Sequence, residues 1–304
     1  MHADWIAYLK TLNLSSHRPA GKQTILAPLA HLSILTVTGS DAAIFLQGQT
    51  TCDIKSLVDC EPSLGAYCNA KGRTISTFFI IKLQNTFQLI LTSELLDTVR
   101  KKLQMYILRA DVQLTDQSDQ LCILGIHNAK LESQSNLYSY PQLDNGALFI
   151  GNPEQAKVFC SKVIQQQDAT LVNENTWLGL DIQAGIPWLF KDTSEDFVPQ
   201  MLNLDKLGAI SFDKGCYTGQ EIVARTHYLG KNKRAIYQAS CDTEASITPG
   251  CEISVTEEDS IAGTVILATK QNSANQLLIV LKDQASDEKN LQLNNQNHDK
   301  ITVM

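Results

Sequence analysis

The sequence predicts an α+β fold that ends in a small β-barrel or sandwich. A chain of 304 residues, 43% hydrophobic and 19% charged, is globular in composition and long enough for two or three domains. Over the first two thirds, strand-like runs alternate with stretches of helical periodicity. From residue 235 onward, short strands follow one another between turn residues such as Pro249-Gly250 and Gly263, without a strong helix among them.

The first α+β region contains a predicted strand over 31–39, a helix over 40–48 with Ser40 as its N-cap, and a strand over 87–92. A hairpin is predicted around the turn residues Lys71-Gly72. Ser93 is predicted to cap the next helix, and the residues at helical spacing on its apolar face are Leu95, Leu96, Val99, Leu103 and Ile107.

The second α+β region contains predicted strands over 121–126 and 147–150, and a helix over 172–185 that ends before Pro187. The chain is therefore predicted to consist of an N-terminal extension, a first α+β subdomain, a second α+β subdomain and a β-barrel, over residues 1–30, 31–118, 119–230 and 231–304.

Charge and composition argue against several classes of protein. The chain has 25 Lys and Arg against 32 Asp and Glu, a net charge of −7, so no direct nucleic-acid partner is expected. The first residues are polar where a secretory signal needs an apolar run, and no segment approaches 18 uninterrupted apolar residues. A cytoplasmic protein away from the membrane is expected, with its eight cysteines as reduced thiols. No cysteine has the spacing of a metal ligand, so no metal site is predicted.

One segment, KGCYTGQEIVARTHYLGKNKR at 214–234, differs from its surroundings. Its TGQE tetrad, 218–221, fits a capping box that starts a helix two residues after Cys216. The helix N-terminus and Lys214 would favour a thiolate at Cys216, which predicts a reactive or ligand-facing thiol. A buried cysteine that fills space beside the helix explains the pattern equally well. A Cys–His nucleophile with His227 is a third interpretation, with weaker support.

The same segment is locally cationic. Against the single acid Glu221 it carries five cations: Lys214, Arg225, Lys231, Lys233 and Arg234. Such a run is either a solvated face or, beside a glycine-framed helix start, a site for a carboxylate or phosphate. Neither a Walker A nor a Rossmann fingerprint accompanies it, which favours a carboxylated ligand over a nucleotide.

KGCYTGQEIVAR resembles the signature of the YgfZ family of folate-binding proteins, relatives of the glycine-cleavage T-protein, an aminomethyltransferase of the GcvT superfamily. Two upstream segments, LTVTGSDAAIFLQGQTTCDI and AYCNAKGRTIS, and the block GIPWLFKDTSEDFVPQMLNLDKLGAISFDKGCYTGQE extend the resemblance over most of the chain. It implies a monomeric, T-protein-like three-lobed ring of two α+β subdomains and a C-terminal β-barrel. Tetrahydrofolate, or a polyglutamylated derivative, would be held in its central cavity.

The resemblance also implies site residues. Cys216 is the functional thiol, with Lys214 beside it. Trp177 looks matched to one of two tryptophans that contact folate in the family, whereas Leu32 stands near the place of the other. Core packing on its helix explains Trp177 as well. The residues of the motif predicted to bind the cofactor are Gly215, Tyr217, Gly219, Gln220, Glu221 and Arg225.

The function implied is that of a tetrahydrofolate-binding accessory protein for the synthesis or repair of iron–sulfur clusters. It would indirectly support tRNA modification by radical iron–sulfur enzymes, and such enzymes or their assembly factors are the expected partners. T-proteins carry an aspartate where KGRTISTF offers Ser76 and Thr77. Because hydroxyls take up a proton poorly at neutral pH, aminomethyl transfer is not expected. The alternative is a folate-dependent one-carbon transferase or demethylase.

Overall fold

A computed structural model describes residues 2–19, 21–130, 135–230, 232–256, 258–271, 274–285, 290–295 and 297–304. The chain divides into two compact units. Unit 1 comprises Met1–Phe45, Ile54–Ser63 and Phe78–Trp177, and unit 2 comprises Leu46–Asp53, Leu64–Thr77 and Leu178–Met304. Among the described helices, none combines the length and apolar character that a membrane span requires.

A five-stranded sheet has the order β3-β4-β5-β2-β6, with strands Ser63–Cys68, Thr74–Leu83, Thr86–Thr92, Leu32–Thr38 and Gln113–Asp116. Helix α3 (Ser93–Gln104) packs on β2 and β5, and its buried side chains are the predicted Leu95, Leu96, Val99 and Leu103. The helix ends before Ile107. Two short helices, α2 (Ala42–Gln47) and η1 (Ile54–Ser56), follow β2.

Two of the predicted caps are wrong. Ser40 donates its hydroxyl to Asp111 Oδ2 at 2.9 Å, because Asp111 lies against the turn before α2. The residue that caps α3 is Thr92, and the Ser93 hydroxyl lies 2.8 Å from the Ser33 hydroxyl instead. In both cases the serine hydroxyl forms its hydrogen bond with a residue distant in sequence and not with the start of the helix.

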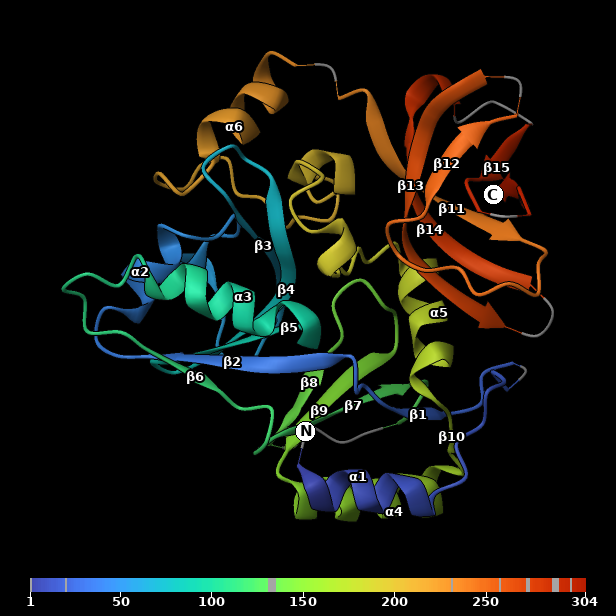
Figure 1. The fold of residues 1–304 in the computed structure, drawn as a ribbon. Coiled ribbons are helices and arrows are strands. Elements are labelled where there is room, and N and C mark those ends of the chain that lie inside the picture. The colour runs from blue at the N-terminus through green and yellow to red at the C-terminus, as the bar shows by residue number, and fades with distance from the viewer. Residues whose placement is uncertain are drawn as a thin grey trace. The chain divides into compact units, whose positions relative to one another are not determined.

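The second sheet of unit 1 has the order β10-β1-β7-β9-β8, with strands Thr170–Leu171, Ile25–Pro28, Cys122–His127, Gly146–Gly151 and Leu137–Ser139. Helices α1 (Ala3–Thr11) and α4 (Pro153–Gln167) lie side by side against this sheet (Figure 1). Their apolar faces share one core, which includes Trp5, Leu26, Leu124, Phe149 and Phe159. The predicted helix before Pro187 is α5 (Glu174–Ala184), which continues from unit 1 into unit 2.

Unit 2 ends in the predicted β-barrel, which is closed in the order β11-β14-β13-β12-β15-β16. Its strands are Arg234–Cys241, Ala274–Lys282, Glu258–Gln271, Glu252–Val255, Leu291–Leu293 and Lys300–Val303. Alternate apolar residues fill the interior, among them Ile253, Val265, Leu277, Ile279, Leu281 and Ile301. The described helical segments that lie wholly within unit 2 are η2 (Lys191–Thr193), η3 (Pro199–Leu202), α6 (Gln220–Tyr228) and η4 (Asp283–Ala285).

Candidate functional site

The glycine-rich motif forms a loop in unit 2 that leads into α6. The helix begins at Gln220, directly after Gly219, whose φ of 83° lies in the left-handed region. The hairpin turn between β3 and β4 touches this point. A Cβ atom on Gly219 would lie 2.5 Å from the Asn69 carbonyl oxygen and 2.9 Å from the Gly72 Cα, so a side chain does not fit there.

The capping box predicted for residues 218–221 is wrong. The Thr218 hydroxyl donates to Gln49 Oε1 at 3.3 Å, and Gly219 occupies the N-cap without a side-chain bond to the helix. Gln220 Oε1 instead accepts from the Tyr217 amide at 3.3 Å. The N-cap therefore lies at Gly219, three residues after Cys216, and not at Thr218, because the left-handed turn at Gly219 precedes the first helical residue, Gln220.

Lys214 is a structural anchor of the loop. It is only 8% exposed, and its ammonium donates to the main-chain oxygens of Thr50 at 2.8 Å and Cys52 at 2.6 Å. It also lies 5.2 Å from the centre of the Tyr217 ring. Burial lowers the pKa of Lys214 to about 8, although Cys52 and Asp53 act in the opposite direction. These hydrogen bonds direct the ammonium to the segment around Cys52, a role that the sequence analysis missed.

Cys216 is exposed, so the interpretation as a buried space-filling cysteine is wrong. Within the part of the chain that the structure describes, its thiol makes no hydrogen bond and no ion pair with His227. The His227 ring is stacked on Phe212, with ring centres 3.8 Å apart. The geometry thus offers an unoccupied thiol on an anchored loop, without the paired base that a Cys–His hydrolase needs.

The other motif residues divide by exposure. Tyr217 is buried, and burial raises the pKa of its hydroxyl. Glu221 and Arg225 are exposed on α6, whereas the opposite face of the helix is held to η3 by Gln200, whose side-chain amide donates to the Val223 carbonyl at 2.6 Å. Gly215 is exposed, with no atom within 4 Å of a Cβ position. Of the cationic run, Lys231 lies outside the described residues.

A second feature of unit 2 is a cavity beside the hairpin that is lined in part by acidic residues. A cavity of about 640 Å³ is lined by Asn69, Ala70, Lys71, Arg73, Glu195 and Asp196. Glu195 accepts from the Asn69 amide at 2.7 Å, and Arg73 donates to the Asp196 carbonyl at 2.5 Å. Partial desolvation raises the pKa of the Asp196 carboxyl, against the opposing charge of Arg73. Sequence reasoning did not connect these acids to the hairpin, because they lie far along the chain.

The two hydroxyls that the sequence resemblance sets at the place of the T-protein aspartate both donate hydrogen bonds to carbonyl groups. Ser76 donates to the Thr77 carbonyl at 2.9 Å, and Thr77 donates to the Pro187 carbonyl at 2.7 Å. Both residues are buried. A neutral hydroxyl takes up a proton poorly at neutral pH, so neither side chain replaces a carboxylate as a base.

Trp177 belongs to unit 1 and is completely buried. Its ring leaves no room for a side chain at Gly125, where a Cβ would lie 2.6 Å away, and Tyr140 packs edge-on at 5.2 Å between ring centres. The indole Nε1 is buried without a hydrogen-bond partner among the described residues. A buried unpaired donor of this kind is rare and calls for an explanation.

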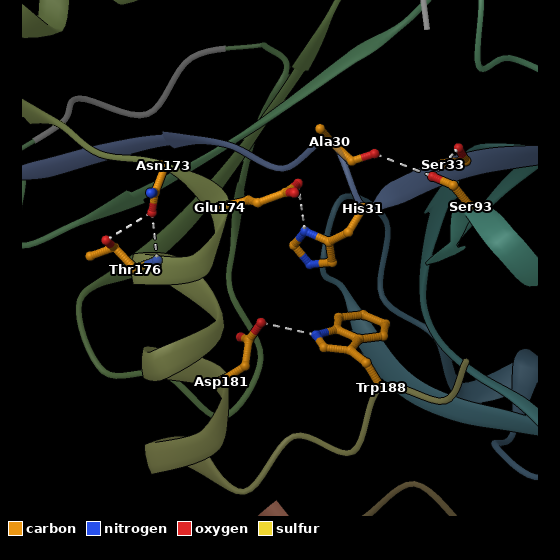
Figure 2. A network of polar contacts seen from close by, with 9 residues as sticks. All are labelled: Ala30, His31, Ser33, Ser93, Asn173, Glu174, Thr176, Asp181 and Trp188. Atoms are coloured by element: carbon orange, nitrogen blue, oxygen red, sulfur yellow. Dashed lines mark hydrogen bonds and ion pairs between the residues drawn. The ribbon is translucent and has the colours of Figure 1, made fainter. Parts of the chain in front are cut away.

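Further unpaired polar atoms lie in unit 1. Both ring nitrogens of His31 and Oε2 of Glu174 are buried without a hydrogen bond in the described residues. Figure 2 shows the two side chains facing each other, with His31 Nδ1 3.7 Å from Glu174 Oε2, an ion-pair distance. His31 holds the pKa of Glu174 below its usual range, against the effect of burial. In unit 2, by contrast, the buried Asp181 accepts from Trp188 Nε1 at 3.0 Å (Figure 2).

Comparison with known proteins gives a consistent result. The chain is 31% identical over 268 residues to the tRNA-modifying protein YgfZ of Klebsiella pneumoniae, covering 81% of each chain. It is 30% identical over 245 residues to the protein of the same name from Colwellia psychrerythraea, covering 75% of this chain and 76% of the relative. The chain belongs to the YgfZ family. No family model matches it.

The fold of this YgfZ family member is that of the T-protein. The glycine cleavage system aminomethyltransferase T from Bartonella henselae superposes with a TM-score of 0.73, covering 96% of this chain and 90% of that one. At 14% identity this similarity concerns the fold alone. The predicted family and the predicted α+β fold with a C-terminal barrel are therefore confirmed.

Proposed function

We propose that this YgfZ family member binds a reduced folate and supports tRNA modification through the synthesis or repair of iron–sulfur clusters, with Cys216 as its functional thiol. The single observation that carries the proposal is the state of Cys216: exposed, unpaired, and on a loop that Lys214 and Gly219 hold in place. An exposed thiol on a loop that is anchored by these contacts suits a functional group better than a surface residue without a role. The relatives' name, tRNA-modifying protein, supports the wider role.

The residues present suit a folate. A pterin ring carries both N–H donors and acceptors. Unit 1 offers Trp177 Nε1, buried without a hydrogen bond among the described residues, as a donor, and Glu174 Oε2, which has His31 at 3.7 Å, as an acceptor. The cationic residues that follow α6 suit the carboxylates of the glutamate tail. The motif residues proposed to bind the cofactor, all in unit 2, are Gly215, Tyr217, Gly219, Gln220, Glu221 and Arg225. In unit 1 the residue proposed to contact folate is Trp177. Tetrahydrofolate, when bound, would supply a carrier for one-carbon groups.

Folate binding is tested by fluorescence. Titrating tetrahydrofolate is expected to change tryptophan emission and to give a saturable isotherm. Trp177→Phe should weaken binding and reduce the signal, because the unpaired indole donor is lost. Trp5→Phe is the matched control, since Trp5 is equally buried in unit 1 within the core of α1 and α4. Equal behaviour of the two variants would show that Trp177 is a core residue only.

The role of the thiol is tested in cells that lack the native protein. Cys216→Ser should fold with unchanged stability, because the side chain is exposed, and should retain folate affinity. It should fail to support iron–sulfur enzymes. Cys60→Ser, at the other exposed thiol, is the control and should support them fully. Full activity of Cys216→Ser at normal abundance would remove the thiol from the proposal.

One observation favours the alternative, a folate-dependent one-carbon transferase or demethylase. Glu195 and Asp196 place carboxylates beside the hairpin, where Ser76 and Thr77 provide none. A carboxyl with a raised pKa, like that of Asp196, suits proton transfer. A glycine-cleavage assay, extended to other methylated amines, separates the two functions. We expect no turnover, and turnover that is lost in Asp196→Asn would establish the alternative.

A further inference from the structure

A cavity in unit 1 lies against one face of helix α4. Its volume is about 420 Å³, and small-molecule sites occupy about 300–1,000 Å³. The residues that line it from α4 include Gln155, Val158, Phe159 and Lys162, which recur at the spacing that brings residues to one side of a helix. From the sheet it is lined by Phe149 of β9. The residues proposed to bind folate are not among those that line it.

The apolar wall of this cavity consists of two stacked phenylalanines and an exposed valine. The Phe149 and Phe159 rings are 4.1 Å apart between centres, with an angle of 12° between their planes. Both rings belong to the core that α4 shares with the sheet, which fixes their position. Gly151 leaves room for them, because a Cβ there would lie 2.9 Å from the Phe149 ring. Val158, which is 68% exposed, extends the apolar wall to the surface.

The polar groups of the cavity that can still bind a ligand are donors. The side-chain oxygen of Gln155 accepts from the Asn152 amide at 3.0 Å in the capping box of α4, which leaves its amino group without a partner among the described residues. The Lys162 ammonium makes no hydrogen bond or ion pair in the part of the chain that the structure describes. Glu154, an acid in the lining, is paired with Lys157 Nζ at 2.8 Å. Free donors beside an acid that is already neutralised suit an anionic group.

We infer that this cavity binds a small aromatic carboxylic acid in its carboxylate form. The wall of Phe149, Val158 and Phe159 holds the aromatic ring, and the Lys162 ammonium binds the carboxylate. An uncharged aromatic compound would leave the ammonium without a counterpart. A simple inorganic anion would leave the apolar wall uncovered. The inference goes beyond the proposed function and does not depend on it, because none of these residues belongs to the Cys216 loop or to the proposed folate site.

The test is a titration of the full chain with indole-3-acetate, followed by NMR of labelled valine methyl groups at pH 7 without folate. The Val158 signals, assigned by their loss in Val158→Ile, should shift saturably with a Kd of about 1 mM or below. The neutral analogue indole-3-acetamide and acetate, which lacks the ring, should bind more weakly. Lys162→Gln should weaken indole-3-acetate by about 2- to 5-fold and leave indole-3-acetamide unchanged. Lys22→Gln, at an exposed lysine of unit 1 outside the cavity, is the matched control.

Val158 signals that do not move, or indole-3-acetamide bound as tightly as indole-3-acetate, would overturn the inference. Val158→Asp should weaken indole-3-acetate by about 5-fold or more, because it places a carboxylate in the apolar wall, and an unchanged affinity would also overturn it. A peptide with a C-terminal tryptophan that binds more tightly than the free acid would assign the cavity to a protein chain end instead. Cys216→Ser should bind indole-3-acetate normally, and tetrahydrofolate should not compete with it. Failure here and failure of the proposed function are therefore separately observable.

Discussion

Gly219 and Gly72 approach so closely that neither position admits a side chain without movement of the backbone. A Cβ on Gly219 would lie 2.9 Å from Gly72 Cα, and one on Gly72 would lie 2.8 Å from Ile222 Cβ. The hairpin turn after β3 thereby sets where α6 begins and how the loop of Cys216 is held. Substitutions at this contact should disturb the motif before they disturb the rest of unit 2.

Gly219→Ala should therefore be costly. The left-handed φ alone costs a non-glycine residue about 1–2 kcal/mol, and the collision with Asn69 and Gly72 adds about 1–3 kcal/mol. Gly208→Ala is the matched control, because Gly208 has a similar φ of 71° and nothing within 4 Å of a Cβ position. Urea unfolding of both variants measures the difference. Equal losses of stability in the two variants would mean that the hairpin turn moves to accommodate the added methyl group.

Lys214→Met should destabilise the protein at pH 7 by about 1–3 kcal/mol, because two main-chain oxygens lose their donor. A pH dependence should distinguish the two proteins. The pKa of Lys214 is about 8 when folded, against an ordinary value of 10.5. Between these values the unfolded chain binds more protons than the folded one, so stability that depends on Lys214 rises with pH in this window. Unfolding at pH 7 and 9.5 should show a gain for the unaltered protein relative to the variant. Equal changes in the free energy of unfolding of the two proteins between pH 7 and 9.5 would contradict the buried position of the Lys214 amine.

Alkylation of the native protein should rank the eight thiols by exposure. Cys60 and Cys216 should react first and Cys251 later, and the slow group should be Cys52, Cys68, Cys122, Cys160 and Cys241. Burial raises the pKa of Cys68 to about 12, which leaves almost none of the reactive thiolate. Peptide mass mapping after a short pulse of iodoacetamide gives the order. A protected Cys216 would contradict the exposed loop.

Trp177 and Gly125 should be energetically coupled. Gly125→Ala forces a methyl group to within 2.6 Å of the Trp177 ring and should cost about 1–3 kcal/mol. In Trp177→Phe the smaller ring leaves space at this position. The double variant should therefore be more stable than the sum of the two losses implies, and a double-mutant cycle measures the coupling. Strict additivity would show that the added methyl group is accommodated elsewhere.

Exchange of both Lys233 and Arg234 for Gln should weaken a polyglutamylated folate more than a monoglutamate, because each added glutamate brings a carboxylate. Added salt should shrink the difference. Exchange of Lys206 and Lys300 for Gln, two exposed lysines of unit 2, is the control. Tyr228→Ala should leave the polyglutamate effect intact, because the tyrosine side chain carries no positive charge. Equal losses for both folates would assign the two cations to another partner.

The sequence by itself determined the features that depend on neighbouring residues. The spacing of Leu95, Leu96, Val99 and Leu103 predicted the buried face of α3, because a helix brings such residues to one side. Turn residues predicted the hairpin at Lys71-Gly72 and the strands of the barrel, and the motif around Cys216 indicated the family.

Only the tertiary structure decided the features set by residues far apart in the chain. The start of α6 at Gln220 follows from the contact of Gly219 with Asn69 and Gly72, and the hydroxyl of Thr218 goes to Gln49. The direction of Lys214, towards Thr50 and Cys52, follows from packing across more than 160 residues of chain. Local sequence offers each of these groups several partners. The fold decides between them, because a polar group that becomes buried must form its hydrogen bond with a partner that the fold places beside it.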